Sequence, residues 1–391
     1  MRAVVVIDGE HYAPVVRDAL ASLPYEVTGV WMAGGAEKLR GGEDYGVPVV
    51  GGFDAAEVVV DLSDEPVLSP AKRFRLASEV LARGLSYVGP DFRFDPPAFE
   101  SFPLPSLAVI GTGKRVGKTA VTGHVAQRLA RDRDVVVVAM GRGGPAEPEV
   151  IDVQPTVESL LELSRSGRHA ASDHLETAVA AGVVTIGCRR AGGGLAGTVT
   201  TSNVAAGAAL AAERTPDVVV FDGSGAAIPP VDVDARILVV GSGQDATAYL
   251  NAYRVLISDV VVALGDPDAN ANTIRALKGI PVVRVDLRLR PLEPLRGRRV
   301  AVFTTGPAPT DHLDADVVAV SHNLADRPRL RHDLESLDAD VYLAELKAAA
   351  IDVVAECAAE RGVDFVLAVN DVSSDELDSV LDGLVPEPVR A

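Results

Sequence analysis

One short segment constrains the fold more than any other: a glycine-rich loop at residues 111–119, between an apolar run and a helical stretch. Residues 107–110 are typical of a buried strand, and the pattern after the loop predicts a helix to about residue 131. Such a strand–turn–helix unit binds anions, because backbone N–H groups and the helix N-terminus point at the ligand. The P-loop ending Gly-Lys-Thr predicts a nucleoside triphosphate site. Its residues are Gly111, Thr112, Gly113, Lys114, Arg115, Val116, Gly117, Lys118 and Thr119.

The loop departs from the usual P-loop spacing at its first glycine. The pattern G-x-x-x-x-G-K-[ST] requires a glycine five residues before Gly117, where this chain has Thr112, and its glycine comes one residue earlier. We expect Lys118 to act catalytically by offsetting charge on the transferring phosphate, and Thr119 to hold Mg²⁺. Asp222 ends another apolar strand and is the carboxylate expected to complete the magnesium site.

Strand-like and helix-like stretches alternate along the chain, which predicts an α/β protein with parallel sheets covered by helices. Prolines are dense at residues 91–105 and indicate a domain boundary. We expect an N-terminal α/β domain at 1–95, a P-loop domain with a sheet of about seven strands at 105–290, and a small C-terminal α/β region at 291–391. Among the individual elements we expect a strand at 45–50 and helices at 171–181 and about 344–361.

The composition of the chain restricts the kinds of partner that it can bind and the compartment in which it works. The chain of 391 residues has a net charge of −18, which disfavours nucleic acid because phosphate contacts need a basic surface. Apolar runs fall short of the roughly 20 residues that span a bilayer, so we expect no membrane partner. The two cysteines, Cys188 and Cys357, do not suggest a disulfide framework and favour the reducing cytoplasm.

Arginines beside glycines follow two of the predicted strands. Parallel strands place their carboxyl ends at one edge of a sheet, where ligands bind. Guanidinium groups match phosphate oxygens, and glycines allow the backbone to approach a ligand closely. The pattern predicts a small acceptor that carries several negative charges, with His11, which follows the first strand, as a further candidate. The expected acceptor-binding residues are Arg142, Gly143, Gly144, Arg189, Arg190 and His11, with Arg189 and Arg190 also expected to act catalytically.

Six segments of the chain carry a family resemblance: residues 7–12, 111–119, 140–145, 188–197, 222–230 and 345–352. Together they resemble the cyclic 2,3-diphosphoglycerate synthetase family, and the resemblance extends over nearly the whole chain. The Gly-Thr start of the loop is also similar to the P-loop of dethiobiotin synthetase. The family resemblance implies an enzyme that uses ATP and Mg²⁺ to convert 2,3-diphosphoglycerate into its cyclic form, with ADP and phosphate as the other products. It also implies a homodimer.

Two alternatives to this reaction remain at the level of sequence. A ligase of the dethiobiotin-synthetase kind would activate a carboxylate or carbamate, and it predicts a less cationic acceptor pocket. A nucleotide-dependent switch protein would hydrolyse the nucleotide slowly and without any small acceptor. The arginine–glycine strand ends favour an enzyme with a polyanionic acceptor over both.

Overall fold

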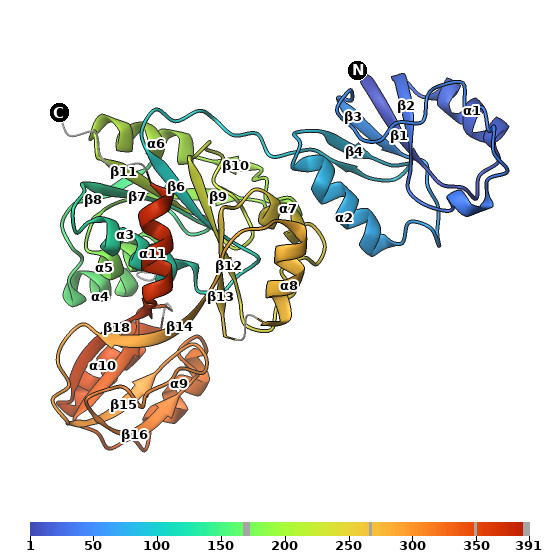
Figure 1. Ribbon diagram of the computed structural model, residues 1–391. Coiled ribbons are helices and arrows are strands. Elements are labelled where there is room, and N and C mark those ends of the chain that lie inside the picture. The colour runs from blue at the N-terminus through green and yellow to red at the C-terminus, as the bar shows by residue number, and fades with distance from the viewer. Residues whose placement is uncertain (167–172, 266–267, 348–349, 386–391) are drawn as a thin grey trace.

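The computed structural model describes residues 1–166, 173–265, 268–347 and 350–385 of the chain. The described strands form one sheet of five strands, with the order β2-β1-β3-β4-β5, and one of 13 strands. Figure 1 shows the smaller sheet and its helices at one end of the molecule, with the P-loop unit in the middle and a C-terminal unit beyond it. Residues 171–172 and 348–349, which belong to two of the predicted helices, lie outside the described residues.

The N-terminal unit is a sheet with helices on both faces. Alternate residues of its first strand enter different clusters: Val5 packs with Leu20 of α1, whereas Val4 packs with Leu76 and Val80 of α2. This alternation follows from the two-residue period of a strand, and it buries both faces. The elements are β1 (Arg2–Ile7), α1 (Ala13–Ser22), β2 (Glu26–Met32), the 3₁₀ helix η1 (Ala36–Lys38), β3 (Val58–Asp61), α2 (Pro70–Leu81), β4 (Ser86–Val88) and β5 (Arg93–Phe94).

The central unit contributes seven neighbouring parallel strands in the order β9-β7-β11-β6-β12-β13-β14. Every residue of β6, β7 and β11 is buried, as expected of strands covered on both faces. The elements are β6 (Ser106–Gly111), α3 (Lys118–Leu129), β7 (Val135–Gly141), β8 (Glu149–Ile151), α4 (Val157–Arg165), α5 (Asp173–Ala181), β9 (Val184–Ala191), β10 (Thr201–Ser202), α6 (Val204–Glu213), β11 (Val218–Asp222), β12 (Ala235–Val240), α7 (Asn251–Leu256), β13 (Val260–Leu264), α8 (Asp268–Leu277) and β14 (Val282–Pro291).

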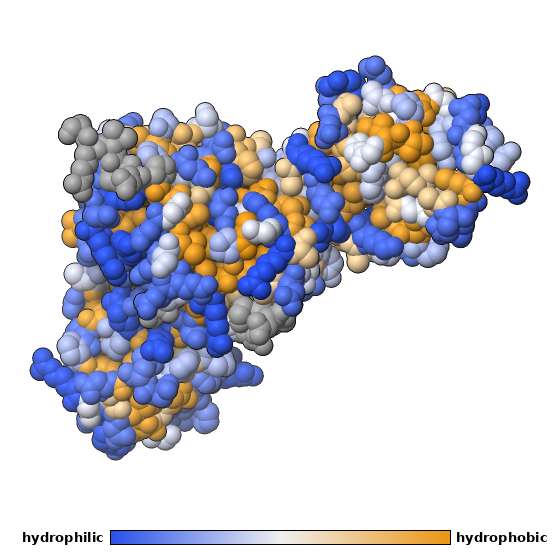
Figure 2. All heavy atoms as spheres, in the orientation of Figure 1, coloured by the Kyte–Doolittle hydropathy of each residue, from blue (hydrophilic) through white to orange (hydrophobic). Residues whose placement is uncertain are grey.

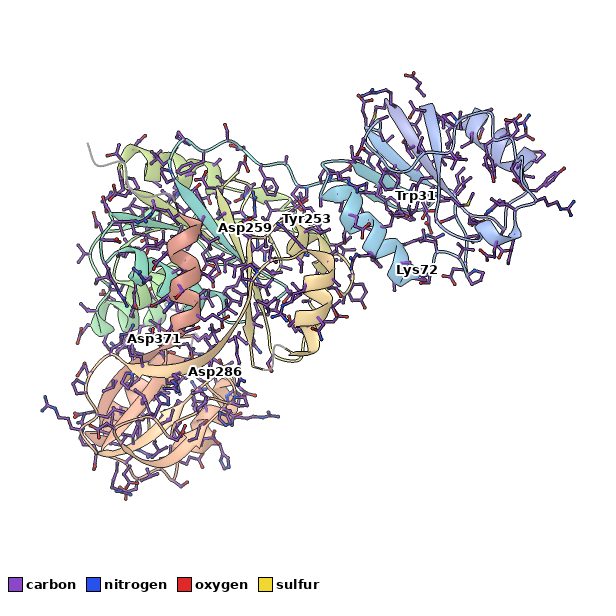
Figure 3. The ribbon with its side chains drawn as sticks, viewed as in Figure 1. Trp31, Lys72, Tyr253, Asp259, Asp286 and Asp371 are labelled. Carbon is purple, nitrogen blue, oxygen red and sulfur yellow. The ribbon has the colours of Figure 1, made fainter. Side chains whose placement is uncertain are left out.

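The C-terminal unit continues the same sheet. The second half of β14 pairs antiparallel with β18, and β18, β17, β15 and β16 are then parallel to one another. Asp286 and Asp371 mark the two strands where the units meet (Figure 3). The elements are β15 (Arg299–Phe303), β16 (Asp316–Ser321), α9 (Arg327–Leu334), β17 (Val341–Glu345), α10 (Ile351–Arg361), β18 (Asp364–Ser373) and α11 (Asp375–Leu384).

Helix α11 belongs by packing to the central unit, although the sequence grouped it with the C-terminal region. His124 of α3 contacts Asp378 at 2.7 Å, and Arg128 contacts Asp382 at 2.6 Å. Leu377 joins the hydrophobic cluster that contains the buried residues of α3. The chain therefore leaves the central unit along β14 and returns to it through β18 and α11, so two passes of the chain anchor the C-terminal unit.

Two predictions differ from the structure: one strand is absent, and one helix starts later than expected. Residues 45–50 do not form a strand, and only one isolated bridge joins Val49 to Val30 in this segment. The helix predicted from about 344 starts at Ile351, because Val341–Glu345 is a buried strand between β15 and β18. The predicted start was too early because residues 344–345, at the end of this strand, are buried in the sheet.

Side chains of both kinds share the visible surface. Hydrophilic and hydrophobic side chains are interspersed over the face of all three units seen in Figure 2. Within the described residues, no helix has the length and apolar character needed to cross a membrane.

Candidate active site

The loop between β6 and α3 has the backbone geometry of a phosphate cradle. Gly117 directly precedes α3 with φ 85°, in the left-handed region that glycine tolerates best. A Cβ added there would lie 2.6 Å from Cδ1 of Leu264, so the position is also closed by packing. Lys118 folds back over the loop, and its Nζ donates a hydrogen bond to the carbonyl oxygen of Gly113 at 3.0 Å. The loop is therefore held in shape by its own lysine before any phosphate binds.

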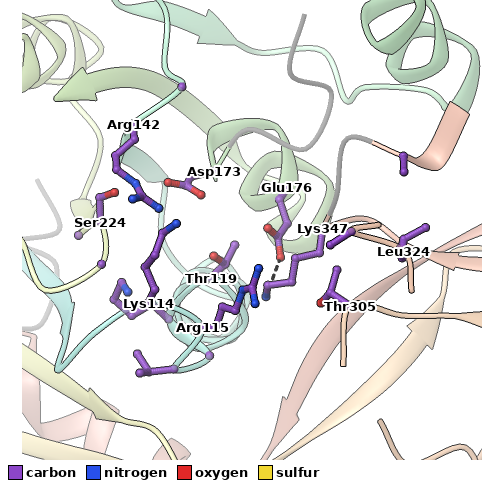
Figure 4. A pocket seen from close by; sticks show the side chains of 18 of the residues that line it. Lys114, Arg115, Thr119, Arg142, Asp173, Glu176, Ser224, Thr305, Leu324 and Lys347 are labelled. Carbon is purple, nitrogen blue, oxygen red and sulfur yellow. Dashed lines mark hydrogen bonds and ion pairs between the residues drawn. The ribbon is translucent and has the colours of Figure 1, made fainter. Parts of the chain in front are cut away.

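A cavity of about 610 Å³ opens in front of this loop, between the central and the C-terminal units (Figure 4). Its volume is in the range of small-molecule sites. The P-loop forms one wall, the strand ends after β7 and β11 and helix α5 continue it, and the C-terminal unit closes the other side. The lining residues are Lys114, Arg115, Val116, Gly117, Lys118, Thr119, Arg142, Gly143, Asp173, Glu176, Gly223, Ser224, Gly225, Thr305, Leu324, Ala325, Arg327, Lys347 and Ala350.

Cations outnumber carboxylates in this lining, although the protein as a whole carries a net charge of −18. Asp173 and Glu176 are the carboxylates, and they lie one turn apart on α5. A concentration of positive charge in a concave site attracts anionic ligands. The cavity therefore suits a ligand set with more negative charge than a nucleotide alone. Its cations are Lys114, Arg115, Lys118, Arg142, Arg327 and Lys347.

Burial sets the electrostatics at the bottom of the cavity. Lys118 is only 8% exposed, and burial lowers the pKa of its ammonium group, which the carboxylates of Asp222 and Asp173 counteract. Burial likewise raises the pKa of Asp222, which the charge of Lys118 counteracts. A bound triphosphate would bring further negative charge to Lys118 and favour its charged form. The carboxylates of the protein therefore compensate the buried charge of Lys118 only in part, and a bound anion would complete this compensation.

The two residues expected to hold Mg²⁺ lie at different depths. Thr119 lines the cavity. Asp222 is 1% exposed at the end of β11, where its Oδ1 accepts a hydrogen bond from Thr122 Oγ1 at 3.0 Å, and the next residue, Gly223, lines the cavity. The structure thus brings the predicted alcohol and carboxylate to the same end of the sheet, with the carboxylate behind the lining.

The predicted acceptor residues on β7 and its loop separate into two groups. Arg142 and Gly143 line the cavity. Gly144 instead packs against the end of β9, where an added Cβ would lie 2.1 Å from the carbonyl oxygen of Cys188. Close approach of two backbones explains the glycine at this position.

The two arginines were expected to follow a strand, but they lie within the last residues of β9, and their environments differ. Arg190 Nη2 donates to the carbonyl oxygen of Ser224 at 2.8 Å and lies 3.3 Å from its Oγ. Since Ser224 lines the cavity, Arg190 supports the wall from behind. Arg189 is exposed and is not among the lining residues; its backbone N–H donates to Asn203 Oδ1 at 2.7 Å.

The structure does not bring His11 to this cavity. His11 lies in the N-terminal unit, at the end of β1, where its Nδ1 is 2.8 Å from Asp8 Oδ1. Asp8 also accepts the backbone N–H groups of Glu10, His11 and Asp64. The histidine completes a hydrogen-bonded turn at a strand end, which is a structural explanation for its position.

Sequence reasoning missed the whole wall formed by the C-terminal unit. Thr305 donates to Glu345 Oε2 through both its N–H and its hydroxyl, at 2.8 and 2.9 Å. Arg327 makes two contacts with the carboxylate of Asp352, at 3.0 and 2.8 Å. A usable signal was the scarcity of lysine: three of the six lysines in the chain, Lys114, Lys118 and Lys347, line the cavity.

Comparison with known proteins places the chain in a family. Three family models match it: the N-terminal domain of cyclic 2,3-diphosphoglycerate synthetase at residues 2–95, the P-loop domain at 106–286 and the C-terminal domain at 291–371. A curated relative named cyclic 2,3-diphosphoglycerate synthetase, from Rubrobacter xylanophilus, is 45% identical over 97% of this chain and 96% of its own length. The chain belongs to the cyclic 2,3-diphosphoglycerate synthetase family.

A second synthetase of the same name, from Methanothermobacter thermautotrophicus, is 38% identical over 98% of this chain and 96% of its own length. Among solved structures, LpxK from Aquifex aeolicus in complex with ATP is 12% identical, with a TM-score of 0.41 over 74% of this chain and 91% of that one. This last likeness is too weak to bear on fold or ligand. Family membership confirms the predicted α/β class with a P-loop core and makes the chain an ATP-binding synthetase.

Proposed function

We propose that this chain uses ATP to convert 2,3-diphosphoglycerate into cyclic 2,3-diphosphoglycerate, with release of ADP and phosphate. The names of the relatives support this reaction, and their similarity extends over nearly the full length of both chains. The observation that carries the proposal is the cationic cavity that joins a P-loop to a second wall. An acceptor with two phosphates and a carboxylate matches such a cavity in size and charge.

The chemistry can proceed in two balanced displacements. First, an oxygen of one substrate phosphate attacks the γ-phosphorus of ATP, the bond from that phosphorus to the β–γ bridging oxygen breaks, and ADP leaves. Second, an oxygen of the neighbouring phosphate attacks the activated substrate phosphorus. The bond to the oxygen shared with the former γ-phosphoryl group breaks, and phosphate leaves with that oxygen. The ring closes as an intramolecular anhydride.

The protein's task in both steps is to hold anions together and in line. The N–H groups of the P-loop and Lys118 would bind the nucleotide phosphates, which leaves the remaining cations for the acceptor. Arg142, at the end of β7, would lie near the transferring group. Arg190 would fix the position of Ser224, and Arg189, on the same strand end, is the remaining candidate ligand of the acceptor. Positioning and electrostatics of this kind can supply most of the rate enhancement of phosphoryl transfer.

Thr119 and Asp222 fit a magnesium ion by their chemistry, since Mg²⁺ prefers oxygen ligands and is bound through few protein groups together with substrate phosphates. The hydroxyl of Thr119 lies in the lining, and Asp222 directly precedes a lining residue. When bound, the ion would supply positive charge to the phosphate oxygens.

We also propose that the protein acts as a homodimer, which sedimentation velocity would measure. Its two free cysteines are consistent with the cytoplasm.

The proposal is tested by incubating the protein with ATP, Mg²⁺ and 2,3-diphosphoglycerate and following the products by phosphorus NMR. We expect the two phosphate resonances of the acceptor to be replaced by those of a cyclic anhydride, with one ADP formed for each ring closed. ADP formation at the same rate without the acceptor, and with no anhydride resonance, would contradict the proposal and favour a nucleotide-dependent switch.

A further inference from the structure

The C-terminal unit presents the carboxyl ends of its strands to the P-loop. Thr305 follows β15, Leu324 follows β16, and Lys347 follows β17, and all three line the cavity. The strands β15, β16 and β17 are parallel, and in parallel sheets the carboxyl ends are where ligands bind. Because β18 is antiparallel to β14, these ends face back toward the carboxyl ends of the central strands. The carboxyl ends of the central strands and those of the C-terminal strands therefore meet at the same cavity.

The two cations on this second wall are held differently. The guanidinium of Arg327 is already matched by the carboxylate of Asp352 on its own unit. Lys347 instead reaches across the cavity to α5, where its Nζ lies 3.4 Å from Oε1 of Glu176. Its side chain is 23% exposed, whereas that of Glu176 is 6% exposed. Lys347 therefore bridges the C-terminal wall and α5, and its side chain keeps some exposure to the cavity.

We propose that Lys347 binds a phosphate group of the acceptor, and that Glu176 holds the lysine in the cavity when no acceptor is present. This assignment rests on the proposed function, because it takes the acceptor to be a small polyphosphorylated acid. An ammonium group has three donors, so Lys347 can contact phosphate oxygens and remain near Glu176. A phosphate dianion offers more negative charge and more acceptor atoms than the single carboxylate at 3.4 Å.

The position of Lys347 separates it from the nucleotide cations. In Figure 4, Lys114 of the P-loop lies on one side of Thr119, and Lys347 lies on the other with Glu176, its contact drawn as a dashed line. Lys118 and the loop itself supply cations and N–H groups for the triphosphate. A cation from a different unit, on the far wall, is placed to bind the second reactant. Lys347 thereby distinguishes an acceptor with phosphate groups from a neutral one.

The test measures acceptor and nucleotide affinities separately in Lys347→Met and Lys347→Arg, with Lys72→Met as the matched control. Lys72 lies on α2 of the N-terminal unit, away from the cavity (Figure 3). Calorimetry gives the affinity for 2,3-diphosphoglycerate, a fluorescent ATP analogue gives the nucleotide affinity, and turnover gives the KM for the acceptor. For Lys347→Met we expect acceptor affinity to fall at least about tenfold and nucleotide affinity to stay within about twofold. Lys347→Arg should recover part of the loss, and Lys72→Met should match the wild type.

A second variant distinguishes a ligand from a purely structural ion pair. Glu176→Gln breaks the same pair but leaves the lysine, so we expect it to keep wild-type acceptor affinity or exceed it. Equal losses in Glu176→Gln and Lys347→Met would overturn the assignment, as would unchanged acceptor affinity in Lys347→Met or an equal loss of nucleotide affinity. Nucleotide binding reports that each variant is folded. A wild-type protein that binds the acceptor but does not cyclise it would contradict the proposed function and leave the affinity test of Lys347 in place.

Discussion

Arg254 offers a sharp test of how the cavity wall is supported, because it is one of the largest fully buried side chains and touches no ligand. It lies on α7 and is 1% exposed. Its Nε donates to the carbonyl oxygen of Ala226 at 3.1 Å, and its Nη1 donates to that of Leu195 at 3.0 Å. Leu195 belongs to the loop after β9 and Ala226 to the loop after β11. Arg254 therefore ties the loop that follows Arg190 and β9 to the loop that carries Ser224.

The substitution Arg254→Met keeps an unbranched chain but removes these donors. Each buried carbonyl left without a partner costs about 1–3 kcal/mol. Part of this cost is offset because the buried charge also disappears, and burial already lowers the pKa of Arg254 to about 10. We expect the free energy of unfolding to fall by about 2–4 kcal/mol. Since a small displacement of a positioning group can reduce the rate strongly, we also expect kcat to fall about tenfold or more.

Urea unfolding followed by circular dichroism measures the first effect, and steady-state turnover measures the second. Arg131→Met, at an exposed position just after α3, is the matched control and should change neither quantity. An Arg254→Met protein with wild-type stability and kcat would refute the reasoning, because it would show that the two loops keep their positions without the arginine.

Three further outcomes are expected. Lys118→Ala should abolish turnover while the unfolding curve stays cooperative, since the lysine closes over the loop; wild-type turnover would refute the P-loop assignment. Arg189→Ala should weaken acceptor affinity but not nucleotide affinity if the arginine binds the acceptor, and an unchanged KM and kcat would exclude it. Burial raises the pKa of the Glu176 carboxyl to about 7, so its contribution to the free energy of unfolding is complete below about pH 4.5 and is lost as the pH rises through 7. Glu176→Gln should remove that pH dependence, up to about 3 kcal/mol between pH 5 and pH 8, and identical pH profiles in urea unfolding would contradict it.

Local patterns sufficed for the nucleotide half of the site. The apolar run before residue 111 and the glycine and lysine that follow fix a strand, a turn and a helix through short-range interactions. Arg142 could be predicted because it directly follows a buried strand, and strand ends of a parallel sheet meet at one edge. The same reasoning predicted Arg190, but nothing in the sequence shows that its guanidinium contacts Ser224 instead of lining the cavity.

The second wall could not be predicted, because it depends on one long-range strand pairing. Residues 305, 327 and 347 reach the P-loop only because β14 pairs antiparallel with β18, and this reverses the direction of the C-terminal strands. Local propensity misled the interpretation around Lys347, where the run of leucine, lysine and alanine favours a helix. The strand Val341–Glu345 forms there because it is buried between two neighbours.

The fate of one oxygen atom tests the central claim most directly. 2,3-Diphosphoglycerate with ¹⁸O in the non-bridging positions of both phosphates is incubated with unlabelled ATP and the protein, and the released phosphate is analysed by mass spectrometry. If the γ-phosphoryl group is first transferred to a substrate phosphate and then expelled by ring closure, each released phosphate carries one ¹⁸O atom from the substrate. Released phosphate without ¹⁸O would show that the γ-phosphoryl group was not transferred to a substrate phosphate and would contradict the account.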